Sequence, residues 1–352
     1  MKIAVYAIAK NEEAFVERFC QSAKDADLIL IADTGSTDGT VEKARACGAV
    51  VHNIHISPWR FDKARDAALA LLPADVDICI SLDLDEVLTE GWREEVERVW
   101  QEDTTRLRYL FEWGPGITFH STKLHARHGY HWHHPCHEYI RADGRIEEVY
   151  AQTNKLLVVH KPDNTKSRAQ YLPLLKLSVE EDPHCPRNAF YYARELYFYR
   201  QWETALDALD NYLAMPNAEW NVERGYAWRV KGLCYKNLGD TSAAIECFLE
   251  SAKEDPTSRE PLVELAQIFY EKQDWGSCYA YSEKALEIKT KPNYYTVEPE
   301  AWGEKPHDLL AIAAYNLETY NIALLHGKLA SELAPENQRL QDNMKFYQLK
   351  AA

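Results

Sequence analysis

The sequence has no long hydrophobic run and no two cysteines at C-x-x-C spacing. Its longest apolar runs, such as Ile29–Ala32, are far shorter than the roughly 18 residues that a membrane-spanning helix needs. Lys10–Glu13 interrupts the first apolar stretch, and no signal-peptide cleavage site follows it. The eight cysteines are scattered, which is typical of reduced thiols. We therefore expect a cytoplasmic protein with no membrane span.

A basic tail or stripe is also lacking. The 352 residues include 40 lysines and arginines against 55 aspartates and glutamates, a net charge of −15, of which −8 falls on residues 1–165 and −7 on the remainder. An acidic surface repels a phosphate backbone, which argues against bulk nucleic acid as a partner. With 46% hydrophobic and 27% charged residues, the composition is that of a globular protein, and the length predicts about two domains.

Residues 1–90 alternate between short β-rich runs and helical patterns. The β-rich runs are Lys2–Ile8, Leu28–Ala32, Val50–Ile54 and Asp77–Leu82, and the helical patterns are Glu12–Lys24, Thr40–Cys47 and Phe61–Leu72. This alternation predicts an α/β domain, residues 1–165, with a mainly parallel, Rossmann-like sheet. Because ligands bind at the carboxyl ends of parallel strands, the loops after Ile8, Ala32 and Leu82 are expected to converge on one site.

From about Ser167 the pattern is helical throughout. Four segments each predict two helices with a short break, namely Ala189–Met215, Tyr226–Pro256, Pro261–Lys289 and Asp308–Pro335. The second helices are predicted to open at Trp202, Thr241, Trp275 and Tyr320, and the small residues Ala205, Ala243, Cys278 and Ala323 follow at spacings of 38, 35 and 45. These spacings are near the 34 residues of a tetratricopeptide unit. Residues 166–352 are therefore predicted to form an all-α helical-repeat domain, with an irregular helical bundle as the alternative; either would be a docking surface.

Two polar segments follow predicted strands. Asp83 and Asp85 flank Leu84 directly after one strand, so alternation along an extended backbone would send both carboxylates to one side. Such oxygen ligands can hold Mg²⁺ or Mn²⁺, and the cation can clamp a diphosphate; the alternative is a solvated strand end. The loop Asp33–Thr40 follows another strand, with glycines for tight turns and Ser36 able to cap the next helix.

In order and spacing, Ile8–Glu12, Asp33–Asp38, Ala64–Asp66 and Asp83–Asp85 resemble the motifs of a family 2 glycosyltransferase with the GT-A fold. The helical half is similar to the subgroup of these enzymes that is fused to tetratricopeptide-like domains. The resemblance implies inverting transfer of a sugar from a nucleotide-diphosphate donor, with UDP favoured, assisted by Mn²⁺ or Mg²⁺. The acceptor hydroxyl or thiol could belong to a peptide, a saccharide or a modified nucleobase.

The resemblance also implies which residues bind the nucleotide. Asp33 matches the acid that hydrogen-bonds the uracil, and Ala7 and Asn11 lie in the segment that lines the base. Arg65 matches the basic residue near the nucleotide, where a guanidinium offers several donors. Thr34 stands where many relatives have a second aspartate, which leaves the base preference open.

The metal side is implied in the same way. Asp83 matches the acid that reaches the ribose or the sugar, and Asp85 matches the one that ligates the metal. His160 ends an apolar, strand-like run, where many GT-A enzymes have a histidine that completes the metal site. The alternative for His160 is a histidine that only caps a strand end.

Seven of the 13 histidines fall between His120 and His137. One interpretation is a zinc site, although the spacing matches no closed structural site. A second is a loop that faces the acceptor, with Trp132 as a stacking platform for a sugar and His137 at the reaction centre. The third is a hydrogen-bonded loop without a chemical role.

Glu138 is the predicted catalytic base. The reaction needs a carboxylate across the sugar from the diphosphate, and Asp83 and Asp85 are assigned to the donor side. Glu138 follows the aromatic, histidine-rich loop and precedes the strand-like run Tyr139–Arg141, which could fix its position. Glu112 is the runner-up.

Two other functions fit parts of the sequence. One is a non-catalytic adaptor in which the α/β half is degenerate, and the other is a nucleotidyltransferase, which also uses paired acids and Mg²⁺. Lys10–Glu13 makes a poor phosphate loop for the latter. In any of these cases the helical repeats could bind a protein partner or a second copy of the chain.

Overall fold

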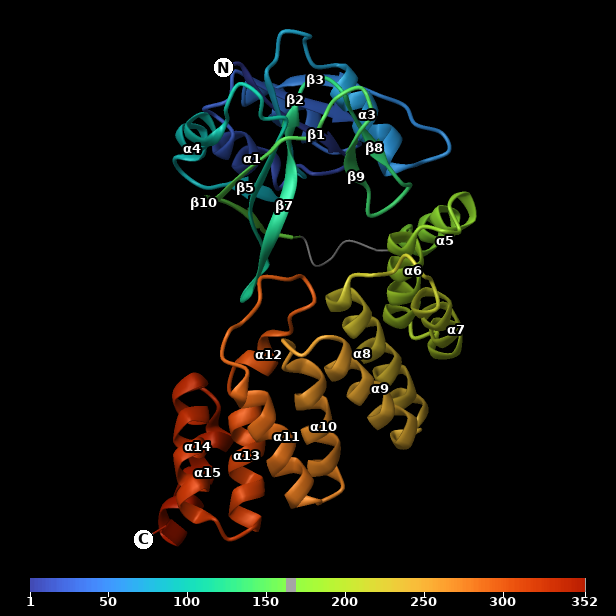
Figure 1. Ribbon diagram of the computed structural model, residues 1–352. Coiled ribbons are helices and arrows are strands. Elements are labelled where there is room, and N and C mark those ends of the chain that lie inside the picture. The colour runs from blue at the N-terminus through green and yellow to red at the C-terminus, as the bar shows by residue number, and fades with distance from the viewer. Residues whose placement is uncertain (163–168, 352) are drawn as a thin grey trace. The chain divides into compact units, whose positions relative to one another are not determined.

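The computed structural model describes residues 1–162 and 169–351 of the chain (Figure 1). These residues form two compact units, Met1–Asp182 and Pro183–Ala352. The domain boundary predicted at 165/166 lies outside the described residues. Within the described part of the chain, no helix is both long enough and apolar enough to cross a membrane.

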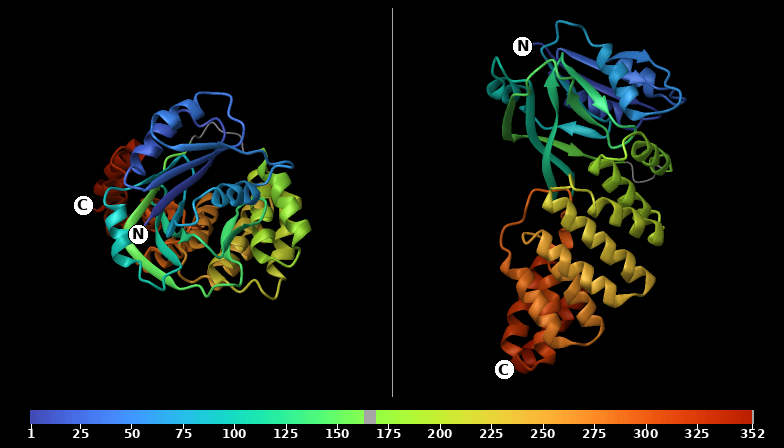
Figure 2. Two further views of the ribbon diagram at one scale, coloured as in Figure 1. Left: turned by 90° about the horizontal axis from the view of Figure 1, so that it is seen from above. Right: turned by 45° about the vertical axis from the view of Figure 1, so that its right-hand side comes forward.

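The first unit is built on an eight-stranded sheet in the order β3-β2-β1-β4-β7-β6-β10-β5 (Figure 2). Its parallel half comprises β1 (Ile3–Ala9), β2 (Leu28–Asp33), β3 (Val50–Asn53) and β4 (Ile78–Ser81). In this half β1 lies between β2 and β4 and runs parallel to both. The predicted Rossmann-like, mainly parallel sheet is thereby confirmed.

Most of the remaining strands were not predicted from the sequence; strand-like runs were expected only at Tyr139–Arg141 and at the run that ends in His160. The other half of the sheet comprises β5 (Glu86–Leu88), β6 (Arg106–Gly114), β7 (Ile117–Ala126) and β10 (Tyr150–His160), while β8 (Tyr130–His133) and β9 (Tyr139–Ala142) form a separate hairpin. Since β7 is antiparallel to β4 and to β6, and β6 is parallel to β10, the strands β4, β6 and β10 run in the same direction. Their carboxyl ends, Ser81, Gly114 and His160, therefore lie at the same edge of the sheet.

Helices cover both faces of this sheet, because successive side chains of a strand point to opposite faces. Ile3, Val5 and Ala7 of β1 belong to an apolar cluster with residues of α1, α2 and α4. Ala4 and Tyr6 belong to a second cluster, with α3 and the β8-β9 hairpin. The helices of this unit are α1 (Val16–Ser22), α2 (Thr40–Ala46), α3 (Phe61–Ala70), α4 (Trp92–Val99) and α5 (Tyr171–Glu181).

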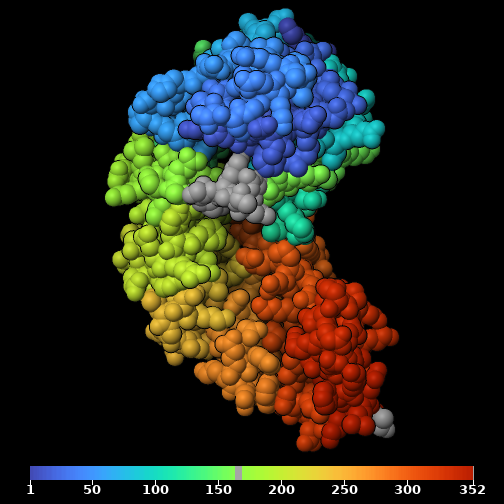
Figure 3. Space-filling model, turned by 180° about the vertical axis from the view of Figure 1, so that it is seen from behind, coloured from blue at the N-terminus to red at the C-terminus, as the bar shows by residue number. Residues whose placement is uncertain are grey.

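The second unit is all-helical, as predicted, and consists mainly of helical hairpins (Figure 1). Figure 3 shows the surface of this unit in space-filling form, coloured from yellow-green to red along the chain. The hairpins are α6 (Pro186–Phe198) with α7 (Trp202–Leu213), α8 (Asn221–Leu238) with α9 (Thr241–Glu254), α10 (Glu260–Glu271) with α11 (Trp275–Glu287), and α13 (Lys305–Asn316) with α14 (Tyr320–Leu333). The remaining helices are α12 (Pro299–Trp302) and α15 (Gln338–Ala351).

All four second helices begin at the predicted residues, and local signals explain two of these starts. The side chains of Asp240 and Asp274 cap α9 and α11 by accepting hydrogen bonds from the backbone three residues on. Gly239, at φ +84°, ends α8 in the left-handed conformation that glycine favours. One detail of the repeat was wrong: the fully buried small residue of the second hairpin is Ala244, whereas Ala243 is half-buried.

Residues 289–298, which we call the strap, explain the long last spacing of the repeat. The strap crosses the first helices of three hairpins. Tyr295 stacks on Tyr191 of α6 at 6.4 Å and donates a hydrogen bond of 2.8 Å to Glu223 of α8. Further along, the backbone N–H of Glu298 donates to Glu260 of α10 at 2.9 Å.

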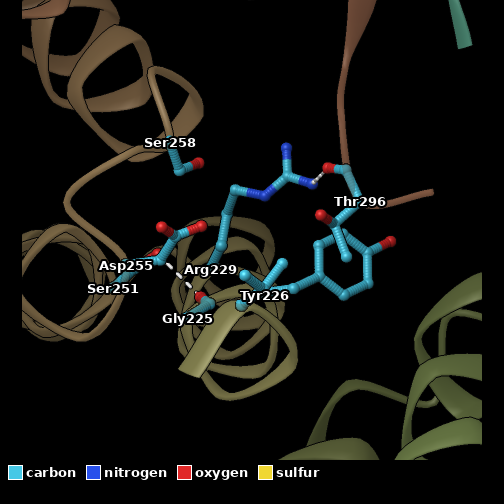
Figure 4. A pocket seen from close by; sticks show the side chains of 8 residues that line it. Gly225, Tyr226, Arg229, Ser251, Asp255, Ser258 and Thr296 are labelled. Atoms are coloured by element: carbon cyan, nitrogen blue, oxygen red, sulfur yellow. Dashed lines mark hydrogen bonds between the residues drawn. The ribbon is translucent and has the colours of Figure 1, made fainter. Parts of the chain in front are cut away.

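Arg229 of α8 fixes the middle of the strap (Figure 4). Its guanidinium is 4% exposed, donates to the backbone carbonyl of Thr296 at 2.9 Å and lies 4.7 Å from the ring of Tyr226. The cavity beside it, about 10 Å³, is polar and has room for a single water molecule.

Candidate functional site

The loops that follow β1 and β2 are joined by hydrogen bonds. Asp33, at the end of β2 and 3% exposed, accepts from the backbone N–H groups of Gly35 and Ser36, each at 3.0 Å. Asn11 accepts from the backbone of Thr37 at 2.8 Å, and its own N–H donates to the Ser36 hydroxyl at 2.9 Å. This places Asn11 and Asp33 together at the carboxyl end of the parallel strands, where a base was predicted to bind.

Ala7 lies elsewhere. It sits inside β1, is 1% exposed and belongs to an apolar cluster. Its predicted contact with a base is therefore corrected, because the open part of the segment begins only after Ala9, where β1 ends. Thr34 donates its hydroxyl to the carbonyl of Ala9 at 2.9 Å and thus ties the end of β2 to β1.

Arg65 of α3 joins two of the predicted acidic residues. Its Nε lies 2.5 Å from Oε1 of Glu138 and its Nη2 lies 2.6 Å from Oδ1 of Asp83. The guanidinium is 4% exposed and lies over the ring of Trp132 at 5.0 Å. Burial alone would lower the pKa of Arg65, but the charges of Asp83 and Glu138 outweigh it, so the pKa is raised and the guanidinium stays charged.

A second cation, Lys123 of β7, also reaches this cluster. Its Nζ lies 2.8 Å from Oε1 of Glu86 and 3.5 Å from Oδ2 of Asp83, and Glu86 accepts from the backbone N–H of Asp83 at 3.0 Å. Burial raises the pKa of Glu86. Burial would also raise the pKa of Asp83, but the charges of Arg65 and Lys123 dominate and hold it well below its usual range.

Sequence reasoning missed Lys123 and Glu86. In a sequence, a lysine on a strand that forms buried ion pairs cannot be distinguished from a lysine that faces solvent. Glu86, directly after the paired aspartates, was the available signal, because a third acid beside two others calls for a neutralising cation.

Asp85 and His160 form a pair on the other side of Leu84. His160 Nε2 lies 3.4 Å from Oδ2 of Asp85, and His160 Nδ1 lies 3.1 Å from the carbonyl oxygen of Trp113. Burial would lower the pKa of His160, but Asp85 and that carbonyl outweigh it and raise the pKa, which favours the form with a proton on Nε2. When Nδ1 donates to the carbonyl, Nε2 is the nitrogen that can bind a metal in place of that proton.

The donor set at this pair suits a cation that shares its ligands with a substrate. In the described part of the chain, no group of three or more histidine, cysteine, aspartate or glutamate side chains is arranged to hold a metal. Asp85 and His160 supply one oxygen and one nitrogen, and Mg²⁺ or Mn²⁺ commonly takes its remaining ligands from substrate phosphates and water. The same finding gives no support to a zinc site in the histidine-rich segment.

Trp132 is buried, so its predicted role as a stacking platform is corrected. The side chain is 2% exposed, and its Nε1–H donates to Tyr6 Oη at 2.9 Å. His125 continues this chain of hydrogen bonds, with Nε2 3.0 Å from Tyr6 Oη and Nδ1 2.8 Å from the carbonyl of Ala126. Since a carbonyl can only accept, Nδ1 must donate and Nε2 must accept from Tyr6. Burial lowers the pKa of His125 to about 3, which keeps the ring neutral.

The two candidates for the catalytic base differ in position. Glu138, with a side chain 10% exposed, belongs to the Arg65 cluster. Glu112 lies on β6 next to Phe111, whose ring is 6.1 Å from that of His160 and so faces the proposed metal pair. Because side chains alternate along a strand, Glu112 points to the opposite face of the sheet. His137, at φ +49°, packs its ring 6.0 Å from Tyr171 of α5.

Part of the chain is similar in sequence to known glycosyltransferases. Residues 5–158 match the family model described as Glycosyl transferase family 2. An uncharacterized glycosyltransferase of Rickettsia bellii is 32% identical over 110 residues, which are 31% of this chain and 36% of that protein. The chain thus spans about a third of the length of the curated relatives that it matches.

Two solved structures are similar to parts of the chain. The C-terminal part of a TPR repeat-containing protein from Cytophaga hutchinsonii shares 17% identity at a TM-score of 0.42, over 52% of this chain and 66% of that one. Glucosyl-3-phosphoglycerate synthase from Mycobacterium tuberculosis, in complex with Mn²⁺, UDP and phosphoglyceric acid, shares 25% identity at a TM-score of 0.27, over 32% of this chain and 44% of that one. The chain is thus similar to family 2 glycosyltransferases over residues 5–158, and a unit of helical hairpins follows this stretch.

Proposed function

We propose that the protein transfers a sugar from a nucleotide-diphosphate donor, with UDP favoured, to an acceptor hydroxyl or thiol, with inversion at the anomeric carbon. The observation that carries the proposal is the cluster in which Arg65 joins Asp83 to Glu138 beside the pair of Asp85 and His160. An intact cluster of this kind favours an enzyme over a degenerate adaptor.

The nucleotide lies along the edge of the sheet. Asn11 and Asp33 face the base, as the family resemblance implies, and Asp83 faces the ribose or the sugar. Arg65 Nη1 is buried and has no hydrogen-bond partner among the described residues. A buried N–H without a partner is rare, and an oxygen of the donor would satisfy it.

Asp85 and His160 would hold Mn²⁺ or Mg²⁺. Such a cation, when bound, neutralises charge that develops on the departing diphosphate. His160 is held for this task by the Trp113 carbonyl at Nδ1, which leaves Nε2 directed at Asp85.

Glu138 receives the proton of the acceptor. As the acceptor oxygen or sulfur forms its bond to the anomeric carbon, the bond from that carbon to the diphosphate oxygen breaks. Arg65 holds Oε1 of Glu138, while Oε2 accepts no hydrogen bond from the described residues and is the atom available for the proton. The ring of Trp132 packs against the guanidinium of Arg65, which helps to fix the position of the Glu138 carboxylate.

The acceptor side extends the proposal to the second unit. The candidate acceptors are a peptide, a saccharide and a modified nucleobase. His137 is proposed to lie on the acceptor side of the site. Helical repeats present extended surfaces, so this unit is proposed to hold the acceptor, a protein partner or a second copy of the chain. The cytoplasmic location stays a prediction.

A panel of nucleotide sugars with Mn²⁺, scored for release of UDP, GDP or CDP by slow hydrolysis, tests the donor without knowledge of the acceptor. Calorimetry of UDP binding tests the metal: Mn²⁺ should strengthen binding to the wild type and should have no effect in Asp85→Ala. Asp75→Ala is the matched control, because Asp75 is an exposed carboxylate that pairs with Lys2. Equal UDP affinity with and without metal in the wild type would contradict the metal site.

A further inference from the structure

A bulky aromatic side chain is exposed beside the proposed metal pair, and the fold gives no reason for it. Trp113, near the end of β6, is 48% exposed, whereas Trp92 and Trp132 of the same unit are each 2% exposed. Leaving a large apolar ring in water forgoes the gain of burying it. A single exposed ring is common on protein surfaces, so the inference depends on where Trp113 lies and on what holds it.

The ring of Trp113 is held firmly on one side. It stacks on the His160 ring with centroids 4.4 Å apart and planes 25° apart, and the Trp113 backbone carbonyl lies 3.1 Å from His160 Nδ1. His160 therefore covers one face of the indole, and the exposed surface of Trp113 is on the rest of the ring. Such a fixed aromatic face costs little conformational entropy when it binds a ligand.

The topology places Trp113 beyond the diphosphate. Base-facing residues follow β1 and β2, whereas Asp85 follows β4, and Trp113 and His160 end β6 and β10 at the same edge. A donor laid along this edge, with its base at Asn11 and Asp33, brings its diphosphate to Asp85. The next chemical group along the edge is the sugar, followed by the acceptor.

We propose that the exposed face of Trp113 stacks against a pyranose ring. An aromatic face matches the C–H groups on the apolar face of a pyranose. The placement of the diphosphate rests on the proposed function. The pyranose has two sources, the sugar of the donor or a saccharide acceptor, and both present the same chemistry to the indole.

The experiment compares Trp113→Ala and Trp113→Phe with the wild type. In the donor arm, calorimetry with Mn²⁺ measures UDP against UDP-glucose, UDP-galactose and UDP-N-acetylglucosamine. In the acceptor arm, saturation-transfer NMR titrates the methyl glycosides of the same three sugars without nucleotide. Trp220→Ala is the matched control, because Trp220 is 44% exposed and lies in the second unit.

Trp113→Ala should bind UDP with Mn²⁺ as the wild type does, to within about twofold, and should lose about three- to tenfold affinity for a pyranose in one arm. Trp113→Phe should keep most of that affinity, and Trp220→Ala all of it. The arm that responds identifies the source of the sugar.

Two results would overturn the inference. One is equal affinity of wild type and Trp113→Ala for every UDP-sugar and glycoside. The other is a loss of UDP affinity equal to the loss of UDP-sugar affinity in Trp113→Ala, because Trp113 would then act only by orienting His160. A wild type that binds no UDP contradicts the UDP donor of the proposed function instead, and the glycoside titration then decides on pyranose binding by itself.

Discussion

Arg65 Nε lies 2.5 Å from Oε1 of Glu138, although the two residues are 73 positions apart in the sequence. The same guanidinium reaches Asp83 at 2.6 Å. One buried cation thus fixes the separation between the candidate base and a carboxylate on the donor side. Glu138 pairs with Arg65, whereas Asp83 pairs with both Arg65 and Lys123, so removal of Arg65 affects Glu138 most.

Arg65→Ala should destabilise the first unit by about 3–5 kcal/mol, because it leaves the buried Glu138 without its cation and Asp83 with Lys123 as its remaining cation. Urea unfolding followed by tryptophan fluorescence measures the effect. The control is Arg98→Ala, which removes an exposed arginine paired with Glu95 on the surface of α4 and should leave the midpoint nearly unchanged. Similar, small shifts for both variants would show that the cluster contributes little to stability.

Glu138→Gln should lose about 10²–10⁴-fold in turnover, as expected when a general base is removed. The amide oxygen can still accept from Arg65, so UDP affinity with Mn²⁺ should stay within a few fold. Glu112→Gln is the control, because that side chain points to the other face of β6. Near-normal turnover in Glu138→Gln together with an inactive Glu112→Gln would move the base to Glu112.

His125 should make stability fall as the pH falls below about 6.5. Burial lowers the pKa of His125 to about 3, so the folded state stays neutral while the unfolded chain takes up a proton near its ordinary pKa of about 6.5. The stabilisation is complete above pH 6.5 and decreases toward pH 3, with a loss of about 2 kcal/mol at pH 5.

The measurement is urea unfolding between pH 5 and 8 in the wild type and in His125→Gln, whose amide oxygen can still accept from Tyr6. The other histidines contribute to both proteins, so the difference between the two pH profiles isolates His125. Parallel profiles would show that His125 is not held neutral.

A chain that ends at Asp182 should fold and bind UDP with Mn²⁺, because the first unit has its own apolar clusters. It should lose transfer to an acceptor that the full chain uses, if the helical unit holds that acceptor. A shorter chain that also lacks α5 should melt earlier, since it loses the 2.6 Å contact between Arg60 and Glu181. Unchanged transfer by the Asp182 chain would rule out acceptor binding by the repeats.

Local patterns predicted the parallel half of the sheet and the starts of the second helices. Strands such as Ile3–Ala9 are short apolar runs between helical patterns, and Asp240 and Asp274 cap the helices that follow them. The order of β7, β6 and β10 depends instead on pairing between distant segments, such as Leu110 with Leu157. No local periodicity encodes which distant strands become neighbours.

The candidate site shows the same division. Asp83, Asp85 and Arg65 were found by motifs, and the structure brings Glu138 and His160 to the same edge. Trp132 and Ala7 were misplaced because burial depends on packing partners from other elements, such as Tyr6 for Trp132. Trp113 gave no signal because an exposed and a buried tryptophan look alike in a sequence.

The strap changes how the helical unit is expected to unfold. In most repeat arrays each hairpin contacts only its neighbours, so the ends can open independently. Here Tyr295 bonds to Glu223 across 72 positions and Arg229 to Glu298 across 69. Such distant links raise the contact order, which slows folding. They also tie the early hairpins to the segment that leads into the last one, so these hairpins should unfold as one cooperative block rather than fray from an end.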